Sequence, residues 1–560
     1  MARLDDEITR HLALAKKRPD DMRVAMNLGR LYQRANNCLE AMGWFSRCIA
    51  ADPRNTDAWT RTGYCLMHLF KIREAQDTFT FVLQLQPAYT DALLGQAICA
   101  ETLGDPAGAL AMMERAIELA PDSDALYPFR AYLVATYRNN PAASLAAFRD
   151  WGRRFADPLT RAAPAPRNDL APLRKLRVGY VSADLRDHSV AYFVEPIFAR
   201  HDRRKFEVCV FASGPADHVT TRLRAGVDQW FDVSAMNDET LTGLVRRQKI
   251  DILIDLSGHT MGNRLLAFAR RPAPVQATWI GFMYTTGMQA MDYRLTDFNM
   301  DPAGKNDAAH SEALFRLQRS ACYLPPPDTP LATEAPMVAG GRPVFASLNN
   351  LKKVTDEALQ LWRRILERVP ESILILIGYE RTQEEAIAQQ QQRLVAAGLP
   401  LERLCILPRL SLGGFMQLGL KADVALDTFP ISGGTTTLHS LWMGLPVVAL
   451  AGDQAFASST SSILRGFGLD ELVASDADAY VARATALARD PGRLSTFRAT
   501  IRERMRNSMM MDYAAYVRDL EAAYRLMWLN HVTGCKRHLD TTVDLAAALA
   551  DCEHLEVAPA

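Results

Sequence analysis

The sequence has few of the features that mark a secreted, membrane-spanning or nucleic-acid-binding protein. Its nine cysteines in 560 residues are odd in number and form no CxxC pair, so neither a disulfide framework nor a zinc site is indicated. No run of 18 apolar residues occurs, and the first twenty residues contain no apolar signal-peptide core. We therefore expect reduced cysteines, no membrane span and a cytoplasmic location.

The chain also lacks an excess of charge of either sign. It has 64 Lys and Arg against 64 Asp and Glu, which leaves no field to attract nucleic acid or an anionic membrane. Hydrophobic residues make up 49% and charged residues 23%, as in globular rather than disordered chains. At about 150 residues per domain, we expect three to four domains and no nucleic-acid partner.

The first quarter of the sequence repeats itself every 34 residues. Four columns keep this spacing: the prolines Pro19, Pro53, Pro87 and Pro121, the small residues Gly29, Gly63 and Ala97, the alanines Ala41, Ala75 and Ala109, and the large residues Phe45, Phe79 and Met113. This period is typical of the tetratricopeptide repeat (TPR), in which small residues let paired helices approach and proline ends the second helix. We predict an α-helical TPR superhelix over residues 1–158, with three full units and an atypical capping unit. Its concave groove is expected to bind an acceptor or partner protein.

Strands and helices alternate after a linker rich in proline and alanine, at residues 159–175. Short apolar runs typical of buried strands lie at residues 176–183, 206–212, 250–258, 343–348, 373–378, 404–408, 422–427 and 446–450. Strands separated by helices predict parallel sheets, so we expect an α/β protein with two Rossmann-like domains, at 176–335 and 336–510. An irregular stretch at about 300–340 joins them, and a helical tail follows at 511–560. Ligands of such sheets bind beyond the C-terminal ends of the strands.

One predicted strand end carries a glycine loop that begins a helix, in the segment TFPISGGTTTLHSLWMG at 428–444. Gly433 and Gly434 permit close approach of the backbone. The N–H groups of Thr435, Thr436 and Thr437 are expected to be free at the helix N-terminus. This arrangement suits an anion, most naturally a diphosphate. The alternative is an ordinary helix capped by threonine.

Three other candidate residues follow predicted strands. Lys353 stands with Lys352 before a helix that Thr355 is expected to cap, where the helix dipole disfavours a cation by about 0.3 to 1 kcal/mol unless an anion is bound. His188 and His259 lie in loops after strands of the other domain, where a histidine can act as general acid or base. The alternatives are a solvated lysine pair and histidines that only hydrogen-bond locally.

Five longer motifs follow the repeats and resemble one known family. They are LRVGYVSADLRDHS, DLSGHTMGNRLLAFARRPAPVQATWIG, TTGMQAMDYRLTD, NNLKK and DTFPISGGTTTLHSLWMGLPVV. Together with the repeats they resemble the O-GlcNAc transferase and SPINDLY family of TPR-containing protein O-glycosyltransferases, of which the chain looks like a bacterial member. The resemblance covers nearly the whole chain, and RRPAPVQ and GGTTT are its most specific stretches.

The resemblance implies a GT-B fold and an inverting glycosyltransferase that needs no metal or cofactor. The substrates would be a nucleotide sugar, in first place UDP-GlcNAc, and Ser or Thr of a protein acceptor held in the TPR groove. Lys353 would neutralise the leaving diphosphate, and His188 would be the base or the histidine that orients the substrate. The implied donor site consists of Asn350, Gly433, Gly434, Thr435, Thr436, Thr437 and His439. His259 and Thr285 are further candidates in the cleft.

The sequence departs from the family at the donor and acceptor contacts. Leu412 and Phe415 stand where animal members carry a lysine and a histidine against uridine, and His439 replaces the acid that holds the ribose. The loop GFMYTTG at 281–287 differs from the family's GYPGTTG-like sequence. In the repeats, the asparagine column that holds acceptor backbone is present at Asn27 and is lost at the next two positions, Arg61 and Gly95.

Three functions remain open at this point. The first is a protein O-glycosyltransferase that uses UDP-GlcNAc. The second is the same chemistry with another donor, such as GDP-fucose or a bacterial sugar placed on flagellin or another surface protein. The third is a TPR binding scaffold with a degenerate catalytic half, against which the intact Lys353 and GGTTT motif argue.

Overall fold

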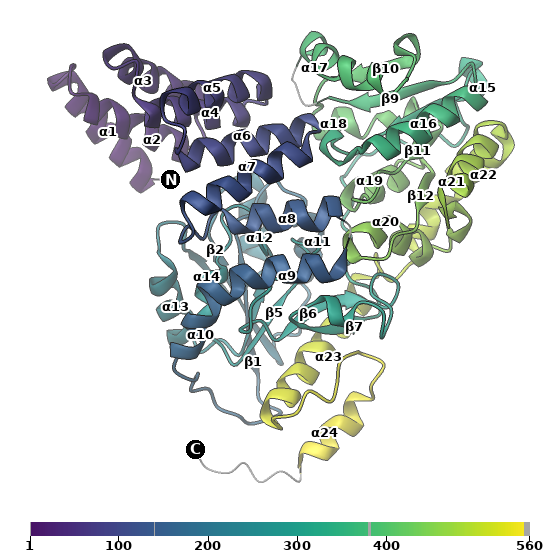
Figure 1. The fold of residues 1–560 in the computed structure, drawn as a ribbon. Helices are drawn as coiled ribbons and strands as arrows, with labels where there is room; N and C mark the ends of the chain where they lie inside the picture. The colour runs from purple at the N-terminus through teal and green to yellow at the C-terminus, as the bar shows by residue number, and fades with distance from the viewer. Residues whose placement is uncertain (1, 139, 379–381, 554–560) are drawn as a thin grey trace.

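The computed structural model describes residues 2–138, 140–378 and 382–553, as a helical arm followed by two α/β domains (Figure 1). The arm comprises α1 (Ala2–Lys17), α2 (Met22–Arg34), α3 (Cys38–Ala51), α4 (Thr56–His68), α5 (Ile72–Leu85), α6 (Thr90–Leu103), α7 (Pro106–Leu119), α8 (Tyr127–Arg138) and α9 (Pro141–Trp151). Helices α2 to α7 form the three expected pairs, preceded by α1 and followed by the pair α8 and α9. The predicted TPR architecture is therefore confirmed.

The small residues of the repeat allow the helices to approach. The ring of Phe79 is fully buried between Gly63 and Gly95. A Cβ added at Gly63 would lie 2.7 Å from this ring, and one added at Gly95 would overlap it. In the 34-residue column, Gly29 and Gly63 thus leave room for the large ring 16 residues later in the same repeat, Phe45 and Phe79, and Gly95 of the next repeat closes over Phe79.

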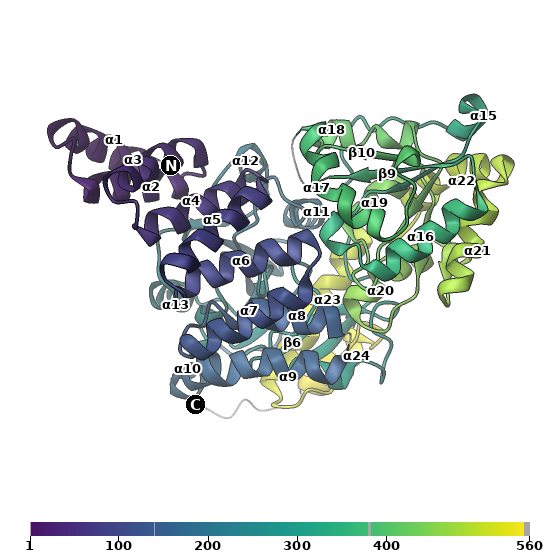
Figure 2. The same ribbon diagram turned by 45° about the horizontal axis from the view of Figure 1, so that its top comes forward.

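The arm merges with the first α/β domain from α6 onward. Leu93 and Met113 of the repeats share one hydrophobic core with Val181 and Phe211 of the first sheet. A π-helical turn, Gly152–Ala156, and α10 (Asp157–Ala162) continue the arm, so helix extends four residues into the segment expected as linker. In both ribbon views α8 and α9 lie across the first domain (Figure 2).

The first domain has a parallel seven-stranded sheet of order β3-β2-β1-β4-β5-β6-β7. Its strands are β1 (Leu176–Ser182), β2 (Phe206–Ala212), β3 (Gln229–Asp232), β4 (Ile252–Asp255), β5 (Val275–Thr278), β6 (Tyr293–Asp297) and β7 (Ala313–Leu317), and its helices are α11 (Ala191–Phe198), α12 (His218–Ala225), α13 (Asp238–Arg247) and α14 (Leu265–Ala269). The stretch expected to be irregular at 300–340 therefore contains a strand. The sequence does not show this strand as an apolar run, because it contains the charged residue Arg316. The side chain of Arg316 is buried and donates to Asp301 O (2.7 Å) and to the Asp307 carboxylate (2.9 Å).

The second domain has a six-stranded sheet of order β10-β9-β8-β11-β12-β13. Its strands are β8 (Val344–Ser347), β9 (Ile373–Ile377), β10 (Leu404–Leu407), β11 (Val424–Leu426), β12 (Val447–Leu450) and β13 (Val473–Ala474). Its helices are α15 (Pro336–Gly340), α16 (Asp356–Arg368), α17 (Gln383–Ala396), α18 (Leu412–Phe415), α19 (Thr435–Trp442), α20 (Ala455–Gly466), α21 (Ala477–Ala488) and α22 (Pro491–Arg506), and a 3-10 turn spans Leu351–Lys353. Both sheets have the central crossover of the expected Rossmann-like halves.

The expected C-terminal tail is partly a core element of the first domain. Helix α23 (Tyr513–Val532) returns from the second domain and contacts β5, β7 and α11. The hydroxyls of Tyr524 and Tyr180 lie 2.9 Å apart, both fully buried. Helix α24 (Leu545–Glu553) follows, and residues 554–560 of the predicted tail lie outside the described residues.

The eight cysteines whose side chains the structure describes are free thiols, and six of them are buried. Within residues 2–138, 140–378 and 382–553, no helix combines the length and the apolar character that crossing a membrane requires.

We predict that Gly95→Ala destabilises the repeats by about 1 to 3 kcal/mol, because the Phe79 ring is held on its other side by Gly63 and has no room to move. The matched control is Gly43→Ala in α3, where an added Cβ meets nothing within 4 Å and helix propensity favours alanine by about 1 kcal/mol. Melting temperatures of the two variants should shift in opposite directions. Equal shifts would contradict the packing of the repeats.

Candidate functional site

The strand ends of the second domain bring Lys353 to the glycine loop. The 3-10 turn that carries Lys353 follows β8, and its Nζ donates a hydrogen bond of 3.1 Å to Ser432 O, directly before Gly433. Asn350 caps this turn, since its side chain accepts from Lys352 N–H (3.1 Å). The predicted lysine and the predicted loop are thus in direct contact across 79 residues of sequence.

Asp427 at the end of β11 fixes the glycine loop. Its Oδ1 accepts hydrogen bonds from Asn349 Nδ2 (3.0 Å) and from Gly433 N–H (2.9 Å). A Cβ at Gly433 would lie 3.1 Å from the same Oδ1 and would overlap the Thr437 hydroxyl. Only glycine permits this approach, so one carboxylate holds the loop against the neighbouring strand end.

The N-terminus of α19 has no side-chain cap. Gly434 occupies the capping position and offers no acceptor side chain, which rules out the threonine-capped helix considered above. Thr435 and Thr436 are partly exposed at this end, beside N–H groups that the helix does not use. Thr437 differs from them, because it is buried and its hydroxyl lies 2.9 Å from that of Thr460. The first two threonines therefore suit an anion, and the third holds α19 against α20.

Burial sets the charge balance of this group. Burial lowers the pKa of Lys353 to about 8. The charge of Asp427 opposes this decrease, and the charge of Lys352 adds to it. Burial also raises the pKa of Asp427 to about 6, against the charge of Lys353 and the hydrogen bond from Gly433. A cation and a helix N-terminus both favour a negatively charged ligand. A bound diphosphate would stabilise the charged form of Lys353.

His188 lies in the loop between β1 and α11, with its side chain 41% exposed. Its Nδ1 accepts from Val190 N–H (3.3 Å), and its Nε2 lies 3.9 Å from Asp184 Oδ1. Burial lowers the pKa of His188, and the charge of Asp184 opposes this. A neutral ring that accepts at Nδ1 carries its proton on Nε2. In this arrangement His188 offers a donor rather than a basic nitrogen.

His439 joins α19 to the first domain. Its Nδ1 lies 2.6 Å from the Tyr323 hydroxyl, and its ring makes edge contacts with Tyr192 (5.0 Å between centroids) and Phe415 (6.0 Å). Burial lowers the pKa of His439 to about 4, so the ring is neutral. Tyr192 lies in the first turn of α11, four residues after His188. The structure therefore brings the segment that follows His188 next to α19.

His259 and Thr285 make local contacts in the structure, and Thr285 also lines a small pocket with Gln454 and Phe456 of the second domain. His259 packs on Phe148 and Trp151 of the arm, and its Nε2 donates to Thr286 O (2.8 Å). The buried Thr285 hydroxyl donates to Glu312 Oε2 (2.7 Å). His259 thus helps to join the arm to the first sheet, whereas Thr285 is hydrogen-bonded within the first domain. No local pattern predicts the packing of His259, because its neighbours come from the capping unit of the repeats.

Three further residues belong to this group and were not predicted from the sequence: Asn349, Asp427 and Ser432. Asp427 had a sequence signal, because it ends the apolar run ADVALD and directly precedes the glycine loop. Asn349 stands beside the predicted Asn350, and only the structure distinguishes their roles. Ser432 contributes its backbone carbonyl, which no sequence pattern predicts.

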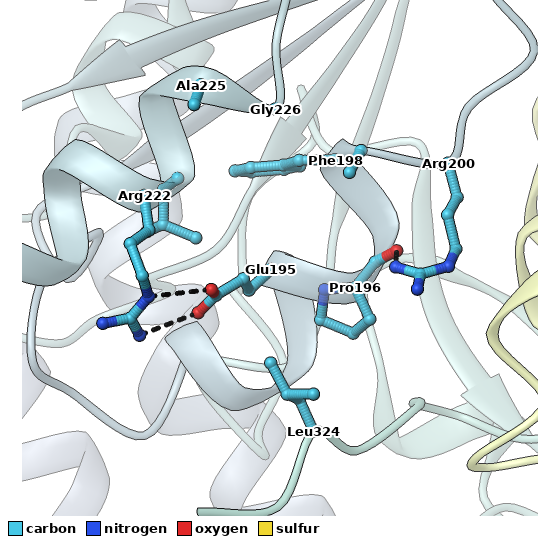
Figure 3. A pocket seen from close by; sticks show the side chains of 10 residues that line it. Glu195, Pro196, Phe198, Arg200, Arg222, Ala225, Gly226 and Leu324 are labelled. Carbon is cyan, nitrogen blue, oxygen red and sulfur yellow. Dashed lines mark hydrogen bonds and ion pairs between the residues drawn. The ribbon is translucent and has the colours of Figure 1, made fainter. Parts of the chain in front are cut away.

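A cavity of about 370 Å³ lies elsewhere, between α11 and α12 of the first domain (Figure 3). The polar groups that line this cavity are hydrogen-bonded within the protein. Arg222 makes two hydrogen bonds to Glu195 (2.9 and 3.0 Å), and Arg200 donates to Pro196 O (3.0 Å). It lies at the C-terminal end of α11, whereas His188 precedes the N-terminal end. This cavity is not part of the candidate site.

Two Rossmann-like domains in contact, each with a parallel sheet, define the GT-B class of fold. The model of glycosyl transferase family 41 matches residues 162–322 and 338–520, and a tetratricopeptide repeat model matches residues 71–124. The chain belongs to glycosyl transferase family 41.

Solved and curated relatives agree with this assignment. The chain is similar to a lysine-to-methionine mutant of Thermobaculum terrenum O-GlcNAc transferase, with 35% identity and a TM-score of 0.86 over 92% of this chain and 98% of that one. It is 39% identical over 395 residues to a Solanum lycopersicum protein named probable UDP-N-acetylglucosamine–peptide N-acetylglucosaminyltransferase SPINDLY, and 28% identical over 392 residues to the Arabidopsis thaliana protein named SEC. These matches cover 69% and 67% of this chain, but only 42% and 39% of the plant proteins. The chain thus spans about two fifths of their length.

We predict that affinity for a nucleoside diphosphate such as UDP is steady near pH 7 and falls above pH 8. The Lys353 charge that attracts the diphosphate is lost as pH rises through its pKa of about 8, so the dissociation constant should rise up to about tenfold per pH unit beyond it. Titration calorimetry from pH 6.5 to 9.5 measures this. A Lys353→Met control should bind more weakly and lose the dependence above pH 8. Unchanged affinity of the unaltered protein between pH 7 and 9 would remove Lys353 from the anion site.

Proposed function

We propose that the protein is an inverting protein O-glycosyltransferase that moves a sugar from a nucleoside diphosphate to Ser or Thr of a protein acceptor. The observation that carries the proposal is the contact of Lys353 with the loop before the uncapped helix α19. There the donor diphosphate would lie against Thr435 and Thr436, and Lys353 would stabilise the charge that develops on it as the sugar leaves. The relatives' printed names support UDP-GlcNAc as the donor.

His188 is proposed to orient the acceptor hydroxyl or the sugar. Its Nε2–H is the free donor of the ring, since Nδ1 already accepts from the backbone. In an inverting reaction the hydroxyl attacks the anomeric carbon from the side opposite the diphosphate, its proton passes to a base, and the diphosphate leaves. The arrangement at His188 favours positioning over proton abstraction. The leaving charge falls on Lys353 and the α19 N–H groups, so we propose that the reaction needs no metal.

The nucleobase contacts support a second candidate donor. Leu412 is 42% exposed, and Phe415 and Tyr192 surround His439 with rings where the family has polar contacts. Stacking on such rings is tolerant of the base. A guanosine donor such as GDP-fucose therefore remains the alternative to UDP-GlcNAc.

We predict transfer from UDP-GlcNAc to a protein acceptor, with UDP and UDP-GlcNAc raising the melting temperature more than GDP and GDP-fucose. Binding to the native state alone makes the shift grow with occupancy. Transfer is followed with a radiolabelled sugar and should survive EDTA. A larger shift with GDP-fucose would select the alternative donor. No transfer from either donor would favour a binding scaffold, and loss in EDTA restored by Mn²⁺ would contradict the metal-independent step.

The acceptor is proposed to bind the repeats through charged side chains. At the position of the missing asparagine, Arg61 donates to Asp57 (2.8 Å) and to Gln33 (3.3 Å), and Arg30 also donates to Asp57 (2.6 Å). Two guanidinium groups share one carboxylate and are partly exposed. This pair suits acidic groups of an extended acceptor better than its backbone.

We predict that the double variant Arg30→Ala, Arg61→Ala lowers glycosylation of the native acceptor about tenfold and leaves donor hydrolysis unchanged, because remote binding energy positions only the acceptor. The control is Arg23→Ala, Arg54→Ala, which removes two exposed arginines outside this network. Point variants are preferred to deletion, because the repeats share a core with the first sheet from α6 onward. Equal rates for both double variants would show that this face does not bind the acceptor.

A further inference from the structure

The end of α6 packs on the turn that carries Lys353, although 250 residues separate them. Helix α6 belongs to the third repeat and contacts Leu351–Lys353 at the strand end of the second domain. In Figure 1 this helix runs from the purple arm to the edge of the green domain. A second contact lies nearby, where the Arg409 guanidinium lies 4.2 Å from the ring of Phe70. The repeats therefore touch both domains.

Glu101 is a buried carboxylate at this contact. It lies on α6, is 2% exposed, and accepts hydrogen bonds of 3.3 Å from the hydroxyls of Tyr132 and Tyr137. Burial raises the pKa of Glu101, and the charge of Lys352 is the main influence that lowers it. A buried carboxylate is costly unless a cation compensates it. The charge of Lys352, on the turn that α6 contacts, acts on Glu101 from beside Lys353.

Gly104 holds the other side of the turn through Arg393. It ends α6 with a φ of +93°, and an added Cβ would lie 2.8 Å from the Arg393 guanidinium. Arg393, on α17, donates to Val354 O and to Asp356 Oδ1 (3.1 Å). Val354 directly follows Lys353. One arginine thus connects the end of α6 to both the turn and the start of α16.

We propose that the end of α6 is part of the donor site, and that Glu101 and Gly104 are positioning residues that hold the turn 351–354 and so aim Lys353 at the donor diphosphate. The inference rests on the proposed role of Lys353. It goes further by making the third repeat a component of the donor site and not only an acceptor surface. Hydrolysis of the donor, in which water receives the sugar, would then depend on the repeats even when no acceptor is bound.

The charges that face Lys353 give this proposal a specific signature. Asp427 favours its charged form, and Lys352 opposes it. Glu101 on α6 faces the charge of Lys352. The hydroxyls of Tyr132 and Tyr137 on α8 lie beside Glu101, and the charge of Arg393 acts on Tyr137. Removal of the Glu101 charge leaves Lys352 uncompensated. Donor hydrolysis that depends on the charge of Lys353 should then be lost at a lower pH than in the unaltered protein.

The test uses the full chain and measures donor hydrolysis without acceptor, UDP affinity and melting temperature. Glu101→Gln and Gly104→Ala should each lower hydrolysis about tenfold, because small misplacement of a charged group has large effects on rate. Their controls are Glu114→Gln, an exposed glutamate on α7, and Gly341→Ala, a left-handed helix end with nothing within 4 Å of an added Cβ. Both controls should hydrolyse the donor at the normal rate.

Charge coupling is tested by rescue. In Glu101→Gln the alkaline loss of activity should begin at lower pH, and adding Lys352→Gln should return it towards its normal position, an effect that loss of packing alone does not produce. Arg393→Gln should also lower donor hydrolysis. Because Arg393 lies on α17, this variant tests the proposal even if a variant of α6 does not fold.

Variants of Glu101, Gly104 and Arg393 that behave like their controls, while Lys353→Met is inactive, would overturn this inference and keep the proposed function. An active Lys353→Met would overturn both. Reduced hydrolysis with an unshifted pH profile and no rescue by Lys352→Gln would also overturn the positioning role, since it would leave only a loss of stability.

Discussion

A partly buried lysine beside a helix N-terminus is the constraint on which the rest of this structure depends. Lys353 and the uncapped start of α19 place positive charge together, and Asp427 compensates only part of it. The same carboxylate holds Gly433, whose missing side chain lets the loop approach. Such a group is electrostatically costly when empty and favourable with a diphosphate. The arrangement of charges in the fold therefore favours an anionic ligand at this place.

Sequence patterns predicted the parts of the molecule that depend on local periodicity. The 34-residue register placed the repeats, and the apolar runs placed eight of the thirteen strands of the two sheets. The GGTTT loop and Lys353 were predicted because strand ends of one sheet meet at one edge. Strands β3, β5, β6, β7 and β13 were missed, as was the return of α23 to the first domain. A buried arginine interrupts β7, and the long-range packing of α23 leaves no local signal. The rings that pack on His259 come from the arm, which no local pattern predicts.

The long-range contacts also change the relation between the repeats and the catalytic part. Periodicity treats the arm as a separate module, but Leu93 and Trp151 belong to the core of the first sheet. The third repeat reaches the second domain as well, through Glu101 and Gly104. The arm consequently contacts both domains. We therefore propose that it contributes to donor binding as well as to acceptor binding.

Proton uptake on UDP binding tests most directly the central claim that the donor diphosphate binds at a partly buried lysine. With a pKa of about 8 in the free protein, Lys353 is mostly neutral at pH 8.5 and charged at pH 7. Binding heats in buffers of different ionisation enthalpy should show uptake of about 0.7 proton per UDP at pH 8.5 and nearly none at pH 7. The uptake at pH 8.5 should be absent from Lys353→Met. Buffer-independent heats at pH 8.5 in the unaltered protein would contradict the account.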